Sequence, residues 1–304
     1  TAQKQMVEVA KALSFDAKLI IMDEPTSSLT EKETAMLLDI IHKLRDEGVA
    51  IVFISHRMNE IFEIADEIAV MRDGQMVKQL SAEGTQEKDV IAAMVGRDVQ
   101  DLFVKAEAPI GDVALEVVGL STKSLLKDIS FKVHAGEIVG FAGLVGAGRS
   151  EVMRAVFGID PRETGEIRVH GKPVRIDSTV DALRAGLGFV PEDRKEQGLI
   201  LKMSVRHNTS IAALSSVAKG WFIDRGAENA LSDEYVAKLR VKTPSNEQKV
   251  MNLSGGNQQK VVIAKWMATH PAVLILDEPT RGIDVGAKKE IHALMSELAR
   301  QGVA

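Results

Sequence analysis

The sequence contains no cysteine among its 304 residues, which excludes a disulfide framework and a thiolate metal site. No apolar run approaches the roughly 20 residues that a membrane-spanning helix needs. Acidic residues outnumber basic ones, with 43 aspartates and glutamates against 38 lysines and arginines, which gives a net charge of -5. A nucleic-acid-binding surface is therefore not expected. Any role at a membrane would have to come through a partner subunit.

What the sequence does contain is an internal repeat. The nine residues 18–26 recur as residues 272–280, with Asp23-Glu24-Pro25-Thr26 matching Asp277-Glu278-Pro279-Thr280. The offset is 277 − 23 = 254, and residues 1–50 align with residues 255–304 without a gap. A period of this length predicts duplicated domains rather than a solenoid. Hydrophobic residues make up 45% of the chain, which is enough apolar material for two cores.

The repeat predicts three segments. Residues 1–98 are expected to be the carboxyl-terminal part of a first domain, here called the first copy. Residues 99–112 are rich in small and turn residues and are expected to be a linker. Residues 113–304 are expected to be most of a second domain, the second copy. Both copies are expected to be incomplete, so that the sequence is a fragment.

Strand and helix patterns alternate along much of the chain, which predicts an α/β fold with a parallel sheet. An Asp-Gly pair within residues 70–77 predicts a hairpin. Residues 198–248 are mostly helical by pattern and are expected to form an inserted helical subdomain. Strands are predicted over residues 50–55, 113–118, 129–133, 137–142 and 272–276. Helices are predicted over residues 88–95, 151–157 and 261–268.

Residues 143–150, GLVGAGRS, lie between a predicted strand and a predicted helix, which is the context of a phosphate-binding loop. Glycines let backbone N–H groups turn toward phosphate oxygens, and a helix N-terminus favours negative charge. Arg149 stands where the G-x-x-x-x-G-K-S pattern has lysine, and its planar fork differs from a compact ammonium. Alone, the segment could be only a glycine turn. The candidate nucleotide-binding residues are Gly143, Gly146, Ala147, Gly148, Arg149 and Ser150, and the Ser150 hydroxyl is also a candidate magnesium ligand.

Two apolar strands end in an Asp-Glu pair. A buried strand places such carboxylates at its carboxyl end, where ligands bind in open α/β sheets. Asp23 and Asp277 are candidate magnesium ligands, and Glu24 and Glu278 are candidates to deprotonate an attacking water. A single pair could be just a polar turn before proline, but two pairs beside a phosphate loop favour catalysis.

Residues 253–260, LSGGNQQK, precede an apolar helix and predict an anion-accepting helix start, with Ser254, Gly255, Gly256 and Gln258 as candidate nucleotide contacts. The alternative is a simple helix cap. In the first copy Thr1 and Ala2 occupy the two glycine positions. His56 follows the predicted strand 50–55 and could contact a terminal phosphate, although alone it would be read as a surface histidine.

With phosphate loop, Leu-Ser-Gly-Gly signature, Asp-Glu strand and His56 in place, the chain resembles the ABC ATPases along essentially its whole length. Residues 143–150, 190–195, 253–260 and 277–286 resemble the second half of fused ATPases from bacterial importers of ribose, galactose and xylose type. The resemblance implies a P-loop NTPase fold of ABC ATPase type in two tandem, incomplete copies with a helical subdomain.

The resemblance also implies function. ATP and Mg²⁺ are the expected cofactors, and the expected activity is ATP hydrolysis coupled to monosaccharide import. The expected partners are two membrane permease subunits and a periplasmic sugar-binding protein, with the chain peripheral on the cytoplasmic face of the bacterial inner membrane. Glu192, a candidate nucleotide-binding residue, is at the glutamine-loop position that faces the permease, and Asp284 closes the segment that crosses between ATPase units.

In the family, each ATP lies between the phosphate loop of one unit and the signature of the other. That pairing would join Asp23, Glu24 and His56 to the Ser254-Gly255-Gly256 signature, and would join the Arg149 loop, Asp277 and Glu278 to Thr1 and Ala2. The first pairing is expected to hydrolyse ATP and the second to turn it over poorly. The first phosphate loop and the counterpart of His56 lie outside the sequence, so the chain alone is expected to be nearly inactive.

Two other functions remain open. A soluble ABC ATPase acting on ribosomes or DNA would be expected to have basic arms or a long charged linker, and this sequence has neither. A nucleotide-gated scaffold without catalysis is disfavoured by Asp23, Glu24 and His56.

Overall fold

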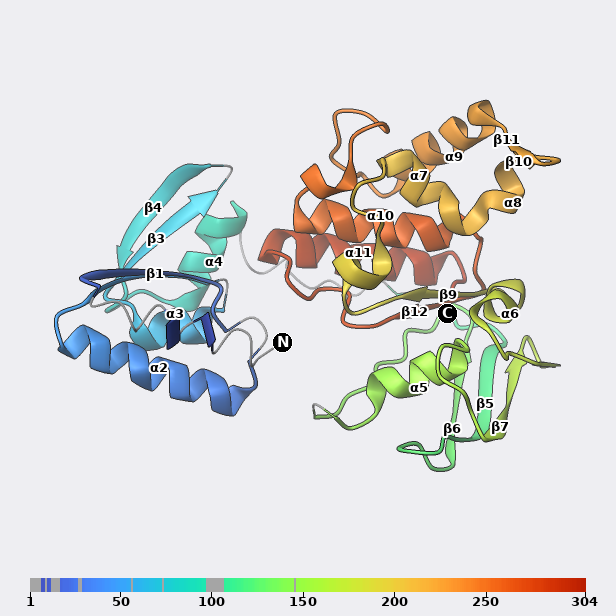
Figure 1. The fold of residues 1–304 in the computed structure, drawn as a ribbon, viewed down its shortest axis with the longest axis horizontal. Coiled ribbons are helices and arrows are strands. Elements are labelled where there is room, and N and C mark those ends of the chain that lie inside the picture. The colour runs from blue at the N-terminus through green and yellow to red at the C-terminus, as the bar shows by residue number, and fades with distance from the viewer. Residues whose placement is uncertain are drawn as a thin grey trace. The chain divides into compact units, whose positions relative to one another are not determined.

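The computed structural model describes residues 7–8, 10–11, 17–26, 29–55, 57–72, 74–96, 107–144 and 146–304. The described residues form two compact units (Figure 1), one comprising the described residues within 7–96 together with residues 284–286, and the other comprising residues 107–283 and 287–304. Of the predicted site residues, His56 lies outside the described residues, as do Thr1 and Ala2.

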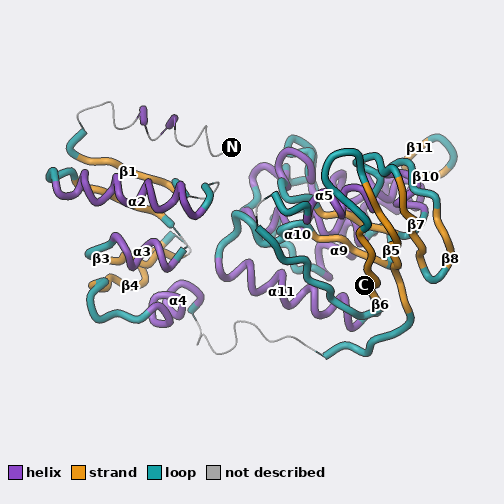
Figure 2. The backbone as a smooth tube through the Cα atoms, turned by 90° about the horizontal axis from the view of Figure 1, so that it is seen from below, coloured by secondary structure: helices purple, strands orange, loops and turns teal. Residues whose placement is uncertain are grey.

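The first unit contains a parallel strand pair covered by one helix. Strand β1 (Leu19–Asp23) pairs in parallel with β2 (Ala50–Ile54). Between them, α2 (Glu31–Asp46) begins at a capping box in which Thr30 and Glu33 bond each other's backbone amides. The buried Leu37 and Ile41 of α2 pack against Ile20 and Met22 of β1, and Figure 2 shows the helix running alongside the strand.

The rest of the first unit is a hairpin with two helices. Strand β3 (Glu67–Arg72) pairs antiparallel with β4 (Gln75–Ser81), and Gly74 in the turn has φ +76°. The hairpin predicted over residues 70–77 is therefore confirmed. Helices α3 (Met58–Ile64) and α4 (Glu87–Val95) share a small core with it, built from Met58, Ile68, Val70 and Val90.

The second unit begins with an antiparallel sheet of order β6-β5-β7-β8. Its strands are β5 (Val113–Ser121), β6 (Ile129–His134), β7 (Thr164–Val169) and β8 (Lys172–Val174). The predicted strands at 113–118 and 129–133 are confirmed. One face of this sheet shares a core with helix α5 (Arg149–Val156), in which Val117, Val156 and Ile167 are buried.

A parallel strand pair lies deeper in the second unit. Strand β9 (Leu187–Val190) pairs in parallel with β12 (Val273–Leu276), and helix α6 (Thr179–Arg184) precedes β9. Helix α10 (Gly255–Met267) and helix α11 (Val285–Arg300) supply buried side chains to the core on the helical side, including Ile263 and Ile291. Trp266 contacts both cores of the unit. The parallel pairing confirms the α/β prediction.

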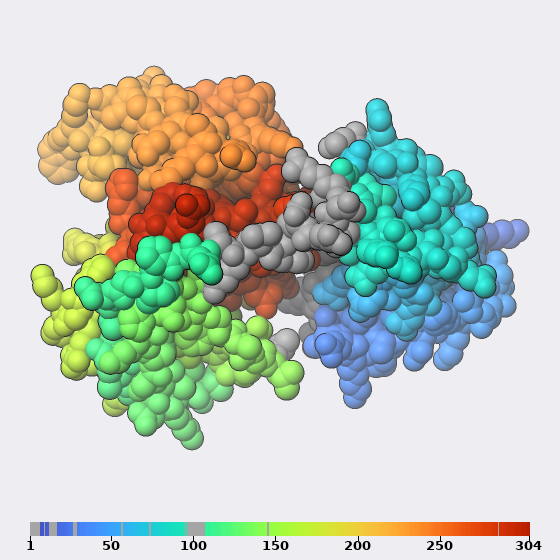
Figure 3. Space-filling model, turned by 180° about the vertical axis from the view of Figure 1, so that it is seen from behind, coloured from blue at the N-terminus to red at the C-terminus, as the bar shows by residue number. Residues whose placement is uncertain are grey.

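A helical subdomain is inserted between β9 and α10, as predicted. Figure 3 shows it in orange on one side of α11, with the antiparallel sheet in green on the other side. The subdomain also contains a two-residue-per-strand hairpin, which the helical pattern did not predict. Its elements are η2 (Arg194–Gly198, a π-helix), α7 (Val205–Ser210), η3 (Ile211–Ala213), α8 (Leu214–Val217), β10 (Ala218–Lys219), β11 (Phe222–Ile223), α9 (Arg225–Lys238) and η4 (Val250–Asn252).

The sequence repeat has a counterpart in the local backbone. Helix α2 spans residues 31–46 and α11 spans residues 285–300, which differ by the same offset of 254. Glu24 and Glu278 both adopt left-handed backbone conformations, with φ of +43° and +42°. Gly48 and Gly302, which follow the two helices, both have φ +87°. Equivalent residues therefore take equivalent conformations where both are described.

The two strands of the repeat differ in burial. Leu19 and Ile21 of β1 are 54% and 65% exposed, whereas their counterparts Val273 and Ile275 of β12 are only 4% and 6% exposed. In the second unit, the core that contains Val156 of α5 covers these positions. In the first unit no described residue provides a comparable cover, so one apolar face of the β1–β2 pair is open.

The predicted strand at residues 137–142 is not confirmed. These residues belong to no strand ladder, although they lead into the predicted phosphate loop. A cavity of about 410 Å³, lined mainly by apolar side chains, separates them from β12. The segment therefore lacks a neighbour with which to form ladder hydrogen bonds. Ile138, Val139 and Phe141 are 45%, 37% and 38% exposed, so the apolar pattern of this segment predicted neither its burial nor a pairing partner.

Among the described residues, no helix combines the length and the apolarity needed to cross a bilayer.

Candidate functional site

The predicted phosphate loop forms a tight turn at the start of α5. Gly146 and Gly148 have φ of +83° and +92°, conformations that favour glycine. Gly148 is the N-cap of α5 and provides no side-chain cap to the first amides of the helix. A side chain on Gly143 would lie 3.1 Å from the Cβ of Ala147. The turn therefore needs its glycines and presents a helix start with uncapped amides, which suits a phosphate group.

Arg149 joins the loop to the Asp-Glu strand. It is the first residue of α5, and its Nη2 lies 3.3 Å from Oε1 of Glu278, just beyond β12. Both side chains are about a third to a half exposed, so solvent screens the pair. The contact shows that the loop and the residues just beyond β12 meet in the second unit.

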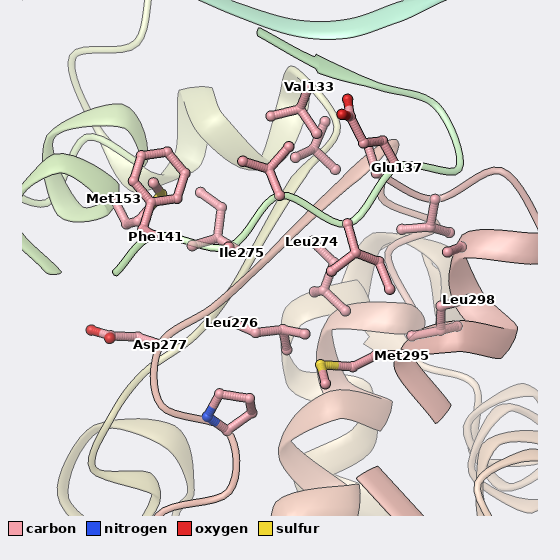
Figure 4. Close-up of a pocket in the computed structure, with 18 of the residues that line it drawn as sticks. Val133, Glu137, Phe141, Met153, Leu274, Ile275, Leu276, Asp277, Met295 and Leu298 are labelled. Carbon is pink, nitrogen blue, oxygen red and sulfur yellow. The ribbon is translucent and has the colours of Figure 1, made fainter. Parts of the chain in front are cut away.

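Asp277 is held at the same end of the sheet by backbone pairing. Its amide donates to the carbonyl of Val190, the last residue of β9, at 2.9 Å. Figure 4 shows the cavity beside β12, where the Asp277 carboxylate points away from the apolar side chains of Leu274 and Met295. Asp277, Glu278 and Arg149 all line this cavity. The second copy thus brings loop cation and both acidic residues together.

One further cation lies near Asp277. Arg154, on α5, is bonded to Asp160 through two hydrogen bonds of 2.9 Å. The bond to Asp160 raises the pKa of Arg154, and the charge of Asp277 adds to this effect. Arg154 belongs to none of the sequence motifs.

In the first unit, Asp23 ends β1 and Glu24 follows it in a left-handed conformation. The Glu24 amide donates to the carbonyl of Ile54 at the end of β2, at 2.8 Å. This bond ties Glu24 to the strand that precedes residue 56. A non-glycine residue at positive φ costs on the order of 1 to 3 kcal/mol. Its occurrence at both Glu24 and Glu278 marks these as constrained positions.

Glu60 is a buried carboxylate that sequence reasoning missed. Its side chain is 1% exposed. It accepts hydrogen bonds from the hydroxyls of Thr26, at 2.7 Å, and Ser55, at 3.1 Å, and pairs with Arg57 at 3.0 Å. Thr26 follows the Asp23-Glu24 pair, and Ser55 and Arg57 flank position 56. Glu60 therefore fastens together the two strand ends that carry the predicted catalytic residues of the first copy.

The signature residues form the start of α10. Ser254 is the exposed N-cap, and its hydroxyl accepts from the Asn257 side chain at 2.8 Å. Gln258 is placed differently from the expectation for a nucleotide contact, since it is only 5% exposed and its amide donates to the carbonyl of Val250 at 3.2 Å. Of the predicted residues, Ser254 and Gly255 lie at the surface end of the helix, whereas Gln258 faces the interior of its own unit.

Packing inside the second unit also explains why the signature has glycine at positions 255 and 256. A Cβ on Gly256 would lie 2.6 Å from the Cβ of Ala287 on α11. A Cβ on Gly255 would lie 2.8 Å from Nη2 of Arg194 and 3.1 Å from the carbonyl oxygen of Gly282. All three distances are shorter than ordinary contacts. The glycines let α10 approach the 281–287 segment closely, whether or not a phosphate is present.

Glu192, the residue predicted to face a permease, pairs with Arg281. Two residues later, the Arg194 guanidinium donates to the carbonyl oxygens of Arg281, at 2.6 Å, and Gly282, at 2.8 Å. Neither arginine was singled out from the sequence as a functional side chain. No sequence signal would have found these contacts, because the partners are 87 and 88 residues apart.

Lys265 is a buried cation on α10. Its Nζ donates to the carbonyl of Gly198, the last residue of η2, at 2.7 Å, and lies 4.9 Å from the centre of the Trp266 ring. Burial lowers the pKa of Lys265 to about 8. The helix that begins at the signature is thus bonded to the segment that follows Glu192.

Comparison with known proteins agrees with this geometry. The ABC transporter family model matches residues 126–281, about half of the chain. A similar solved structure, cbiO1 of Clostridium perfringens, from the ABC transporter complex cbiONQ, is 25% identical with a TM-score of 0.51 over 62% of this chain and 76% of that one. A nucleotide-free ATP-binding cassette from an ABC transporter is 18% identical, with a TM-score of 0.54 over 63% of this chain and 79% of that one.

The curated relatives extend the match to the whole sequence. The ribose import ATP-binding protein RbsA 2 of Streptomyces avermitilis is 50% identical over 303 residues, covering 100% of this chain and 60% of that protein. A protein of Rhizobium etli named for ribose, galactose and methyl galactoside import is 50% identical over 304 residues, covering 100% of this chain and 59% of that protein. The chain therefore spans about three-fifths of the length of these relatives. By its family match and its fold, the chain belongs to the ABC transporter family.

Proposed function

We propose that the chain is part of the ATP-binding subunit of an importer and couples ATP hydrolysis to the uptake of a monosaccharide. The observation that carries the proposal is the identity of about 50% along the whole chain to proteins named for ribose import. The identity covers the residues of both copies. The sugar itself would be selected by other subunits.

The proposed nucleotide is ATP with Mg²⁺, and the residues of the second copy fit this group. The uncapped start of α5 and the left-handed glycines 146 and 148 suit phosphate oxygens. Ser150, in the first turn of α5, and Asp277 would supply the oxygen ligands that Mg²⁺ prefers. When bound, the ion would neutralise charge that develops on the phosphates. Arg149 would bind phosphate, and Glu278 would accept a proton from water.

We infer two tandem ATPase copies with unequal roles. Residues 1–98 would be the carboxyl-terminal part of the first copy, joined to the second copy by residues 99–112. Three observations support this division: the shared offset of 254, the matching φ values of Glu24 and Glu278, and the open apolar face of β1–β2. In the pairing that the family resemblance implies, Asp23, Glu24 and His56 act with the unaltered signature and hydrolyse ATP. In the same pairing, the copy that carries Arg149 would use the altered signature positions Thr1 and Ala2 and would bind ATP with little turnover.

The proposed partners are two membrane permease subunits and a periplasmic sugar-binding protein. The chain would lie on the cytoplasmic face of the bacterial inner membrane, held there by the permease. Glu192 would face the permease, because it stands at the position of the family's glutamine loop. The names of the relatives support import as the direction of transport.

The test is reconstitution of the protein, as its gene encodes it, with the permease and binding-protein genes that neighbour it. We expect the ATP-binding protein to co-purify with the permease, and its ATPase activity to rise with one pentose or hexose from a panel. Uptake of that sugar into vesicles should require ATP. ATP hydrolysis without permease association would instead favour a soluble ABC ATPase and contradict the proposal.

A further inference from the structure

Three segments of the second unit meet at one arginine. The Arg194 guanidinium donates to the carbonyl oxygens of Arg281 and Gly282, at 2.6 and 2.8 Å, and so holds the turn between the Asp-Glu strand and α11. Its Nη2 also occupies the space beside Gly255, where a Cβ would come within 2.8 Å. Arg194 therefore lies between the start of the signature helix α10 and the 281–282 turn.

The segment that carries Arg194 is itself anchored at both ends. At its start, the Asp193 side chain accepts from the amides of Lys195, at 2.9 Å, and Glu196, at 3.1 Å. At its end, the carbonyl of Gly198 accepts from the buried Lys265 on α10. Between them the chain forms a π-helix, a geometry that occurs often at functional sites. Movement of this segment would therefore be transmitted to α10.

A second contact joins the same segments. Glu192 pairs with Arg281. The 192–194 segment and the 281–282 turn are therefore joined by two arginines, one from each segment. In the first copy the residue that corresponds to Arg281 is Ser27, and Ser28 corresponds to Gly282, at the offset of 254. Arg281 is therefore present in the second copy but has no arginine counterpart in the first.

We propose that Arg194 is a positioning residue, which holds the signature helix α10 and the 281–282 turn as one body so that Ser254 and Gly255 reach nucleotide in a productive geometry. The Glu192–Arg281 pair links this body to the segment proposed to face the permease. The inference rests on the proposed function, because the signature acts on nucleotide only if the protein is an ATPase.

The test compares Arg194→Ala and Arg194→Lys in the permease-assembled protein. Hydrogen bonds from a charged group contribute enough that their loss should lower kcat for ATP by about tenfold in Arg194→Ala. The KM for ATP should change little, because Arg194 positions the signature and does not hold the phosphate loop. Lysine keeps the charge but has no planar fork to bond two carbonyls, so Arg194→Lys should give an intermediate kcat. Arg175→Ala, at an arginine whose side chain is 87% exposed, is the matched control and should leave kcat unchanged.

Amide hydrogen exchange supplies a readout apart from activity. In Arg194→Ala, exchange should accelerate in peptides that cover residues 253–259 and 280–284, and not in peptides of the antiparallel sheet. Faster exchange throughout the second unit would mean a general loss of stability and would contradict a positioning role. If the parent protein is active and both Arg194 variants keep its kcat, the positioning role of Arg194 is overturned but the proposed function is not. A parent protein without sugar-stimulated ATPase activity would instead overturn the proposed function.

Discussion

The guanidinium of Arg149 contacts the carboxylate of Glu278, with 3.3 Å between Nη2 and Oε1, although the residues are 129 positions apart. The loop cation of the second copy is thus engaged by the residue proposed to activate water. A phosphate group that binds Arg149 has to compete with this carboxylate.

This competition predicts opposite effects of two substitutions on ATP binding. Glu278→Gln removes a negative charge beside the phosphate site and should tighten binding by about two- to fivefold, because the pair is partly screened. Arg149→Ala removes the cation and should weaken binding by a similar factor. A titration with a fluorescent ATP analogue at low and high salt would measure both. Weaker binding in Glu278→Gln would contradict the competition.

A second prediction concerns Glu60. Glu60→Ala would leave two hydroxyls and Arg57 without their shared acceptor, so the first unit should lose about 2 to 4 kcal/mol of unfolding free energy. Both tryptophans of the chain, Trp221 and Trp266, lie in the second unit, so amide exchange of residues 50–70 is the suitable measurement. Glu63→Ala, at an exposed position of the same helix, should have no comparable effect. Equal exchange in the two variants would argue against a stabilising role for Glu60.

Packing at the signature gives a third prediction. Gly256→Ala would place a Cβ 2.6 Å from that of Ala287 and should destabilise the second unit by about 1 to 3 kcal/mol. Gly140→Ala is the control, because no atom lies within 4 Å of the added Cβ. Urea unfolding followed by tryptophan fluorescence would compare the midpoints. If Gly256→Ala unfolds at the parent midpoint, the close approach of α10 and α11 is wrong.

Lys265 gives a prediction for the pH dependence of stability. Burial lowers the pKa of Lys265 from 10.5 to about 8, so between these pH values the unfolded state binds more protons than the folded state. The unfolding free energy should therefore rise with pH across this window, by at most about 1.4 kcal/mol per pH unit. Below pH 8 the lysine is protonated in both states and this contribution is constant.

The measurement is urea unfolding at pH 7 to 10 for the parent protein and two variants. Lys265→Met should lose the pH-dependent rise, whereas Lys238→Met, at an exposed position of α9, should retain it. A rise of the same size in Lys265→Met would assign the effect to other groups.

Local pattern predicted much of the fold. The hairpin around Gly74, the helical insertion and the Asp-Glu strands could be predicted because each depends on residues close in sequence. The strand at 137–142 could not be settled in this way, since a ladder needs a neighbour and apolarity does not provide one. In the second unit the backbone pairing of β12 with β9 placed Asp277, which no local pattern specifies.

The sequence motifs identified which residues belong to the site better than they identified the contacts between those residues. The motifs located Arg149 and Glu278, but not the bond between them. Glu60 and Arg194 were missed because their roles depend on partners 34 and 87 residues away. Gln258 was chosen for its place in the signature, and the structure shows its amide bonded to Val250 inside the unit. Sequence motifs indicate chemistry, whereas these contacts depend on how distant segments pack.

In the proposed division of roles, the first copy hydrolyses ATP and the second copy mainly binds it. The measurement that tests it most directly is steady-state ATPase activity and sugar uptake of Glu24→Gln and Glu278→Gln, each in the protein assembled with its permease. Loss of a group that acts on the attacking water should lower the rate by about 10²- to 10³-fold in Glu24→Gln. Glu278→Gln should lower both rates far less, because the phosphate loop of its copy carries Arg149 in place of lysine. Equal losses in the two variants would mean two equivalent sites and would contradict the account.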